Sequence, residues 1–261
     1  MTLPKISPGP TGRFHHQVVA ITGGARGIGK TYAHRFAGEG AGIVISDLDV
    51  REGRRTAAEL QELGAQVVAI EADVTRTADA ASIAREALET FGRLDVLVNN
   101  AGIHGAESRI PYTQEALPDW RRLLDVNVLG PLNCSLACRE ALGADGGGVI
   151  INHSSVAAFS SYGAYGLSKL ALNSLTASLA RELADDDIRV VGIAPGMVDS
   201  ENVFESTNEE LRQKRLDAQV IRRMGSMDDL AAAALFLASE QASFVTGTTM
   251  IIDGGLSCLT R

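Results

Sequence analysis

Short apolar runs alternate with longer amphipathic stretches along most of the chain. The run Val18–Ile21 is followed by a helical pattern from about Gly27, and the run Ile43–Ser46 by another from about Val50. Apolar residues at successive positions are typical of strands that are buried on both faces of a parallel sheet. The alternation of strand and helix therefore predicts an α/β fold.

The alternation continues to the end of the sequence, and about seven strands are expected in all. A long helical pattern carries leucines on one face between Leu167 and Leu183. Further strands are predicted near 67–70, 96–98, 149–151, 188–194 and 249–252, and further helices near 78–91 and 120–142. The predicted architecture is one doubly wound, Rossmann-type parallel sheet with helices on both faces.

The domain boundaries follow from where this pattern stops. Residues 1–16 hold three prolines and show no periodicity, so we expect a flexible arm. No linker composition interrupts residues 17–261, which are predicted to form a single domain. Periodicity weakens again at about 197–226, around a short helical pattern at 209–218, and a polar excursion of this kind is typical of a substrate loop or lid.

Composition and charge narrow the class of partner. The 261 residues carry 24 basic and 32 acidic side chains, a formal charge of −8, which disfavours nucleic acid and anionic lipid. Neither the N-terminus nor the longest charge-free stretch, Gly146–Ser168, resembles a membrane span. The three cysteines lack metal-ligand or redox spacing, so no metal site is predicted and a reducing cytoplasm is the expected location.

A glycine-rich turn, Thr22–Gly29, follows the first strand and opens a helix. Glycines let the backbone approach a pyrophosphate that faces the free N–H groups of a helix N-terminus. Tight turns need glycine for backbone reasons alone, but the strand before, the helix after and an acid at the end of the next strand favour a dinucleotide site. The contacts predicted in this turn are Gly23, Arg26, Gly27, Ile28 and Gly29.

The acid at the end of the second strand is Asp47, close to the roughly 20-residue offset of a carboxylate that binds the adenosine ribose. Such a carboxylate repels a 2′-phosphate, and Leu48 beside it is not basic, so NAD is predicted over NADP. A solvated loop aspartate is the other interpretation. NADP stays an alternative because basic residues stand nearby, namely Arg26, Arg51, Arg54 and Arg55.

Tyr165 and Lys169 lie four residues apart at the start of the long helix and so share one face. This spacing alone is common by chance. Polar or glycine-containing motifs accompany it at the carboxyl ends of strands or in helices beside them, where open parallel sheets bind ligands. These motifs are Asn99–Gly102, Asn127, Ser154–Ser155 and Pro195–Gly196.

In these motifs, their order and the chain length, residues 17 to about 257 resemble the short-chain dehydrogenase/reductase family. The resemblance implies an enzyme that interconverts a secondary alcohol and a ketone with NAD(H). It implies Tyr165 as proton donor and acceptor, and Lys169 as the residue that binds the nicotinamide ribose and lowers the tyrosine pKa. It also implies Ser155 as the holder of the substrate oxygen, and Asn127 as support for a water-linked proton path.

The resemblance extends to the rest of the two binding sites. Further implied cofactor contacts are Asp73, Val74, Asn100, Ala101, Gly102, Pro195, Gly196, Val198 and Ser200, besides Asp47, Leu48, Tyr165 and Lys169. The expected substrate contacts are His104, Ser155, Tyr165, Met197, Val203 and Phe204. A lone loop histidine such as His104 is more often a solvated surface group.

Two departures and three alternatives accompany the resemblance. The segment between Ser155 and Tyr165 is shorter than usual, so Ser154 remains an alternative serine, and Ser200 stands where threonine is frequent. A homotetramer, or a dimer, is implied by the resemblance alone. A non-catalytic NAD(H) sensor of the same fold and a carbonyl reductase that prefers NADP stay open as other functions, whereas the short C-terminal part argues against an epimerase or dehydratase.

Overall fold

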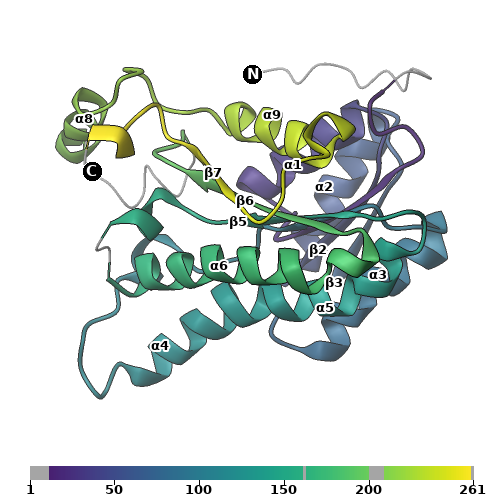
Figure 1. Ribbon diagram of the computed structural model, residues 1–261, viewed down its shortest axis with the longest axis horizontal. Helices are drawn as coiled ribbons and strands as arrows, with labels where there is room; N and C mark the ends of the chain where they lie inside the picture. Colours follow the sequence, from purple (N-terminus) through teal and green to yellow (C-terminus); the bar gives the residue numbers. More distant parts are fainter. Residues whose placement is uncertain (1–11, 161–162, 200–208, 260–261) are drawn as a thin grey trace.

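The computed structural model describes residues 12–160, 163–199 and 209–259 (Figure 1). Within these ranges seven strands, all paired in parallel, form one sheet in the order β3-β2-β1-β4-β5-β6-β7. They are β1 (Val18–Thr22), β2 (Gly42–Asp47), β3 (Val67–Glu71), β4 (Val96–Asn99), β5 (Val149–His153), β6 (Arg189–Pro195) and β7 (Thr249–Ile252). The predicted doubly wound sheet is confirmed. The order reverses between β1 and β4, so their carboxyl ends open the crevice where such sheets bind ligands.

Helices cover both faces of the sheet (Figure 1). One face carries α1 (Gly27–Gly38), α2 (Val50–Glu62) and α9 (Met227–Ala238). The other carries α3 (Thr77–Phe91), α5 (Gly130–Gly143) and α6 (Gly163–Glu182), with α4 (Leu117–Leu124) before α5. The helix α8 (Glu209–Asp217) stands apart from both layers, over the carboxyl ends of β6 and β7 (Figure 1).

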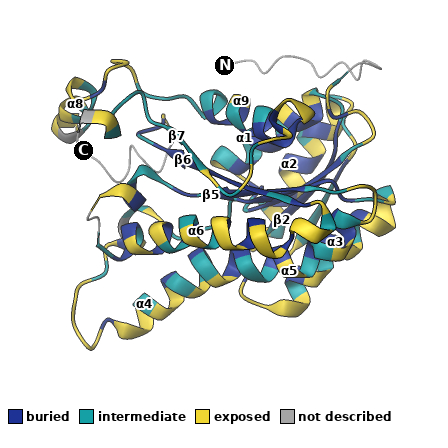
Figure 2. Ribbon diagram, in the orientation of Figure 1, coloured by how far each residue is buried: buried dark blue, intermediate teal, exposed yellow. Residues whose placement is uncertain are grey.

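The strands feed two separate hydrophobic cores because successive side chains point to opposite faces. Val19 and Ile21 of β1 join the core under α1 and α9, while Val18 and Ala20 join the core over α3, α5 and α6. The central strands are accordingly buried along their length (Figure 2). This two-sided burial is the reason that each strand is a continuous apolar run in the sequence.

Residues 12–16 pack onto the domain, although the sequence placed them before its boundary. Phe14 has no exposed surface, and its ring meets Phe36 edge to face with the centroids 5.0 Å apart. The N–H of Phe14 donates to the carbonyl of Glu39, 3.0 Å away. The predicted arm over 1–16 is therefore wrong for residues 12–16, because one anchoring aromatic leaves no periodic signal. Residues 1–11 lie outside the described ranges.

None of the helices in the described ranges has the length and the apolar character that a membrane crossing requires. In the same ranges no group of three or more His, Cys, Asp and Glu side chains is arranged to hold a metal ion.

Candidate active site

A pocket of about 2540 Å³ runs along the carboxyl ends of the strands. Its lining includes the glycine turn and Asp47, and also Ser155, Tyr165 and Lys169. Every cofactor contact predicted from the sequence lines this pocket, apart from Ser200, which lies outside the described residues. The predicted substrate contacts His104 and Met197 also line it, whereas Val203 and Phe204 are not described.

Close packing of the backbone requires glycine at two positions of the turn. A Cβ on Gly29 would lie 2.1 Å from the carbonyl oxygen of Gly23 and 2.7 Å from Nδ2 of Asn100. Gly23 has a φ of +63°, and a Cβ there would approach Ala101 to 2.9 Å. Asn100 holds this packing in place, because its Nδ2 donates to the carbonyls of Thr22 and Gly23, each at 3.0 Å.

The N-terminal turn of α1 is built to receive an anion. Arg26 occupies the N-cap position in extended conformation, and its side chain makes no capping hydrogen bond. The first N–H groups of a helix lack partners inside the helix and attract negative charge. Around Gly27, with φ +54°, no atom lies within 4 Å of the place of a Cβ. The turn therefore fits the pyrophosphate of a dinucleotide.

Asp47 supports the glycine turn from the end of β2. Its Oδ2 accepts a hydrogen bond from the N–H of Ala25 and its Oδ1 one from the N–H of Asp49, each at 3.0 Å. Each carboxylate oxygen has a second lone pair, so the group can hold the turn and still accept from a ribose hydroxyl. Leu48, next to it, is 68% exposed at the pocket.

The arginines that left NADP as an alternative cofactor either pair with a carboxylate or do not line the pocket. Arg26 pairs with Asp49 at 3.0 Å, and Arg55 pairs with Glu52 at 2.8 Å. Arg51 and Arg54 do not line the pocket. Nothing in this arrangement removes the repulsion that Asp47 exerts on a 2′-phosphate.

The residues for which the resemblance implied adenine contacts follow β3. Asp73 lines the pocket, and its Oδ1 accepts hydrogen bonds from the N–H and the hydroxyl of Thr75, at 2.9 and 2.7 Å. The carbonyl of the neighbouring Val74 accepts from Nδ2 of Asn133 on α5, at 2.9 Å. These bonds fix the backbone that the sequence predicted to contact adenine.

The two candidate serines have different partners at the end of β5. Ser154 is buried, and its hydroxyl donates to the main-chain carbonyl of Lys169 at 3.3 Å. Ser155 is half-buried at the pocket, and its side chain is hydrogen-bonded to Tyr165, which lies in the first turn of α6. The hydroxyl that lies beside the phenol is therefore that of Ser155.

Lys169 is 4% exposed, one helical turn beyond Tyr165. Its Nζ donates to the main-chain carbonyl of His153 at 2.7 Å and lies 5.7 Å from the centroid of the Tyr165 ring. Burial lowers the pKa of Lys169 to about 8. Burial also raises the pKa of Tyr165, and the hydrogen bond with Ser155 lowers it in part. The net pKa of Tyr165 is therefore raised, because desolvation of the phenolate dominates, and the lowering by Lys169 that the resemblance implies stays a prediction.

We expect Lys169→Met to raise the unfolding free energy at neutral pH. The folded-state pKa of about 8 lies below the ordinary 10.5, so the folded chain binds this proton more weakly than the unfolded chain does. The penalty of roughly 3 kcal/mol is fully present below pH 8 and disappears as the pH rises through the unfolded value. Losing the bond to His153 offsets about 1 kcal/mol of the gain.

Urea unfolding of both proteins at pH 7 and pH 9.5 measures this difference. The advantage of the methionine variant should shrink at the higher pH, where the folded wild type has already released the proton. An advantage of equal size at both pH values would show that Lys169 is not charged and buried at neutral pH.

The helical stretch that the sequence predicted over 120–142 is present from Leu117 to Gly143, but it is not regular throughout. A π-helical turn, Asp125–Leu129, separates α4 from α5 and holds Asn127, which is 1% exposed. Asn127 Oδ1 accepts from the N–H of Ile103 at 2.7 Å, and its Nδ2 donates to the Ile103 carbonyl at 3.0 Å and to the Ser168 hydroxyl at 3.1 Å. Asn127 therefore lies behind the pocket wall and ties the loop after β4 to α6.

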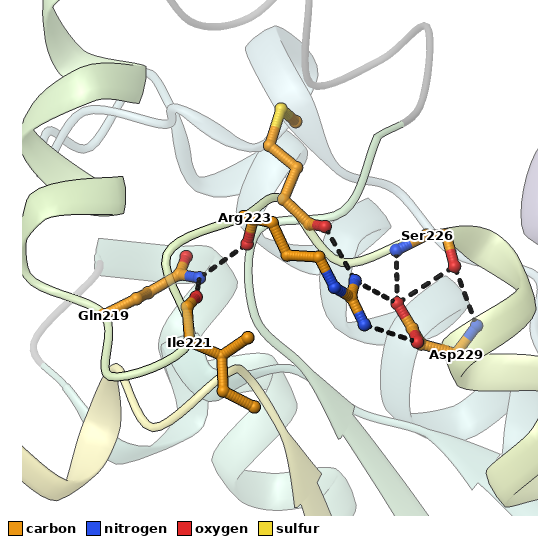
Figure 3. Close-up of polar contacts among 6 residues, drawn as sticks. Gln219, Ile221, Arg223, Ser226 and Asp229 are labelled. Carbon is orange, nitrogen blue, oxygen red and sulfur yellow. Dashed lines mark hydrogen bonds and ion pairs between the residues drawn. The ribbon is translucent and has the colours of Figure 1, made fainter.

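The segment after α8 is anchored beside the pocket in a way that sequence reasoning missed (Figure 3). The carboxylate of Asp229 accepts from both terminal nitrogens of Arg223, at 2.7 and 2.9 Å, and from the N–H and hydroxyl of Ser226. The N–H of Gly225 donates to the carbonyl of Met197 at 3.0 Å. The anchor thus fixes the wall that Met197 provides. Its signal in the sequence is the Ser-x-x-Asp capping box ahead of an apolar helix.

Comparison with known proteins identifies the family. Residues 23–257 match the family described as enoyl-(acyl carrier protein) reductase, which covers most of the chain. The chain belongs to the short-chain dehydrogenase/reductase family. The match starts at the glycine turn and includes Ser155, Tyr165 and Lys169 of the pocket.

Characterised relatives of this short-chain dehydrogenase/reductase align over nearly their whole length. Glucose 1-dehydrogenase 2 of Bacillus subtilis (strain 168) is 37% identical over 242 residues, covering 91% of this chain and 93% of that protein. The 7alpha-hydroxysteroid dehydrogenase of Escherichia coli (strain K12) is 35% identical over 246 residues, covering 93% and 95%.

A solved structure gives the same result at the level of the fold. The structure of 7 alpha-hydroxysteroid dehydrogenase complexed with NADH and 7-oxo glycochenodeoxycholic acid has a TM-score of 0.88 and 35% identity, and it covers 93% of this chain and 95% of that one. This short-chain dehydrogenase/reductase is therefore an oxidoreductase that uses a nicotinamide dinucleotide.

Proposed function

We propose that the enzyme interconverts a secondary alcohol and a ketone by hydride transfer with NAD(H). The observation that carries the proposal is the grouping of Tyr165, Ser155 and Lys169 in one pocket with the uncapped glycine turn. The names of the relatives, a glucose dehydrogenase and a hydroxysteroid dehydrogenase, agree with oxidation of a hydroxyl group.

The residues of this chain fit a dinucleotide along the length of the pocket. The N–H groups at Gly27–Gly29 bind the pyrophosphate, Asp47 binds the adenosine ribose, and Lys169 binds the nicotinamide ribose. The nicotinamide, when bound, supplies or accepts the hydride. Leu48 is uncharged and offers no basic group to a 2′-phosphate. The carboxylate of Asp47 therefore selects NAD over NADP.

Tyr165 carries the proton in the proposed mechanism. In reduction its hydroxyl donates a proton to the ketone oxygen, and in oxidation its phenolate accepts the alcohol proton. Ser155 donates a hydrogen bond to the same substrate oxygen and stabilises the charge that develops on it. Before substrate binds, the hydrogen bond with Ser155 favours the phenolate. Once Ser155 turns its single proton to the substrate oxygen, the ammonium group of Lys169 opposes the effect of burial.

The substrate lies at the end of the pocket beyond Tyr165. Met197 provides a buried apolar wall there, and His104 lines the opposite loop. Partial desolvation and the charge of Lys169 lower the pKa of His104, which favours the neutral imidazole. We extend the substrate site to Val203 and Phe204, and the cofactor site to Ser200, on the family resemblance.

An absorbance assay at 340 nm tests the proposal directly. Secondary alcohols such as hydroxysteroids, and the hemiacetal of glucose, are offered with NAD+ and with NADP+. The matching ketones, and the lactone of glucose, are offered with the reduced cofactors. We expect a change in absorbance with at least one alcohol and with NAD+. A protein that binds NADH but turns over no alcohol or ketone in such a panel would instead be the NAD(H) sensor.

Asp47→Asn is expected to erode the preference for NAD at least about tenfold, which corresponds to ~1.4 kcal/mol. The amide removes the negative charge that repels a 2′-phosphate. Its one oxygen can still accept from the N–H of Ala25, whereas the bond from the N–H of Asp49 is lost. The measurement is the ratio of kcat/KM for NAD+ to that for NADP+ in wild type and variant. An equal loss with both cofactors would mean that Asp47 acts only by holding the N–H of Ala25.

We propose further that the enzyme is a cytoplasmic homotetramer assembled through α5 and α6, with a dimer as the alternative. Large apolar side chains are about half exposed on and beside these helices, namely Leu129, Leu136, Leu167 and Leu170. Light scattering is expected to give the mass of four chains, and Leu136→Glu combined with Leu170→Glu a smaller assembly. A wild-type monomer would contradict both forms.

A further inference from the structure

Tyr32 and His153 form a hydrogen-bonded pair that the mechanism above does not use. Tyr32 lies on α1, in the turn after the glycines, and His153 is the last residue of β5. The phenolic oxygen lies 3.1 Å from Nδ1, and the ring centroids are 5.9 Å apart. The pair joins the helix that presents the glycine turn to the strand that leads into Ser154 and Ser155.

The burial of the Tyr32 hydroxyl determines which atom donates the hydrogen bond between Tyr32 and His153. Tyr32 has no exposed surface, and among the described residues its hydroxyl bonds to His153 alone. If Nδ1 carried the proton, the phenolic O–H would be buried without an acceptor, at a cost of about 1–3 kcal/mol. Tyr32 therefore donates to Nδ1, and the ring proton of the neutral imidazole sits on Nε2.

The opposite edge of the imidazole faces the pocket. His153 is half-buried and lines the pocket, while the completely buried Tyr32 closes its Nδ1 side. The exposed part of the ring is thus the edge that carries Nε2. The ring is also neutral, because burial and the charges of Lys169 and His104 lower the pKa of His153 to about 3.

The alternation of β5 places this edge on the side of the glycine turn. The neighbouring side chains turn to α6, since Asn152 donates to the Thr176 hydroxyl and Ser154 to the Lys169 carbonyl. His153 points to the opposite face, toward α1. Its main-chain carbonyl meanwhile accepts from Nζ of Lys169. One residue thus anchors the lysine and presents a donor to the pocket.

We propose that His153 donates a hydrogen bond through Nε2–H to an oxygen of the nicotinamide half of the bound dinucleotide, and that Tyr32 is the positioning residue that fixes this tautomer. The acceptor is a ribose or phosphate oxygen, because His153 contacts Lys169 on one side and packs against α1 behind the glycine turn on the other. The inference rests on the proposed function in taking a nicotinamide dinucleotide as the ligand.

The tautomer is tested without any ligand. Long-range 1H–15N correlation spectra distinguish a ring proton on Nε2 from one on Nδ1, and loss of the signal in His153→Gln assigns it. The wild type is expected to carry the proton on Nε2, and Tyr32→Phe to show a mixture of both tautomers. A wild-type proton on Nδ1 would overturn the proposal.

The contact is tested by a matched pair of variants in fluorescence titrations. The amide nitrogen of glutamine reaches the place of Nε2, whereas that of asparagine reaches only the place of Nδ1. His153→Asn is expected to raise the Kd of NADH about tenfold and His153→Gln to leave it within about threefold. Both variants should bind ADP, which lacks the nicotinamide half, as the wild type does.

Three results would overturn the contact: wild-type affinity in His153→Asn, equal losses in both variants, or a matching loss of ADP binding. The last two would assign His153 a purely structural role. A wild type that binds neither NADH nor NADPH would contradict the dinucleotide site itself, and it is recognised before any variant is compared.

Discussion

Tyr165→Phe is expected to lower kcat about 10²- to 10⁴-fold and to leave the Kd for NADH within about threefold. The change removes one oxygen, the atom that exchanges the proton with the substrate in the proposed reaction, and leaves the ring beside Lys169 in place. An interaction made only in the transition state lowers kcat without weakening ground-state binding. Steady-state rates and a fluorescence titration with NADH measure the two effects.

Tyr112→Phe is the matched control for this experiment. Tyr112 is 78% exposed, packs against Trp120 and does not line the pocket. The same deletion of a phenolic oxygen should leave both kcat and Kd unchanged there. Unaltered turnover in Tyr165→Phe would refute the assignment of the proton to this residue and would move it to another group such as Ser155.

Gly29→Ala is expected to weaken NADH binding at least about 100-fold, or roughly 2.7 kcal/mol. The new methyl group would lie 2.1 Å from the carbonyl oxygen of Gly23 and 2.7 Å from the amide of Asn100. Asn100 cannot withdraw without breaking its bonds to Thr22 and Gly23. The turn must therefore shift, and its N–H groups no longer converge on one anion.

Gly38→Ala separates this effect from the general consequence of placing alanine in α1. Gly38 closes the same helix, nine residues beyond Gly29. It borders the pocket, but no atom lies within 4 Å of the place of its Cβ, so a methyl group there displaces no part of the turn. This variant should bind NADH as the wild type does and gain up to about 1 kcal/mol in stability. Thermal unfolding of both variants is measured with the titrations. Wild-type affinity in Gly29→Ala would mean that the turn does not hold the pyrophosphate.

The sheet could be predicted from the sequence because burial on two faces leaves an unbroken apolar run at each central strand. The run at 96–98, for example, became β4 (Val96–Asn99). The π turn at Asp125–Leu129 could not be predicted from the sequence. Valines and leucines continue through it, and a π turn needs one extra residue rather than a distinctive composition. Phe14 escaped notice for a similar reason, since one buried ring makes no pattern.

In the candidate site, too, some features could be predicted from the sequence and others could not. The glycine turn, Tyr165 and Lys169 form local motifs, and the structure brings them to one pocket. The direction in which Ser154 and Ser155 turn depends on how the strand end twists, and the pKa of Tyr165 depends on its burial, so neither follows from spacing. The partnership of Tyr32 and His153 joins residues 121 positions apart. Its single mark in the sequence is a histidine at the end of an apolar strand.

The wide turn that holds Asn127 has a consequence for changes in the length of this chain. Each residue of an α-helix advances about 100° around the axis. Deleting one residue between 125 and 129 would restore a regular rod, but it would rotate everything ahead of it by that angle relative to α5. Leu123, now without exposed surface, would swing toward water, and the amide of Asn127 would leave the backbone of Ile103. A surface loop tolerates the deletion of one residue. In this turn the same deletion removes the contacts that hold the loop after β4 behind the pocket.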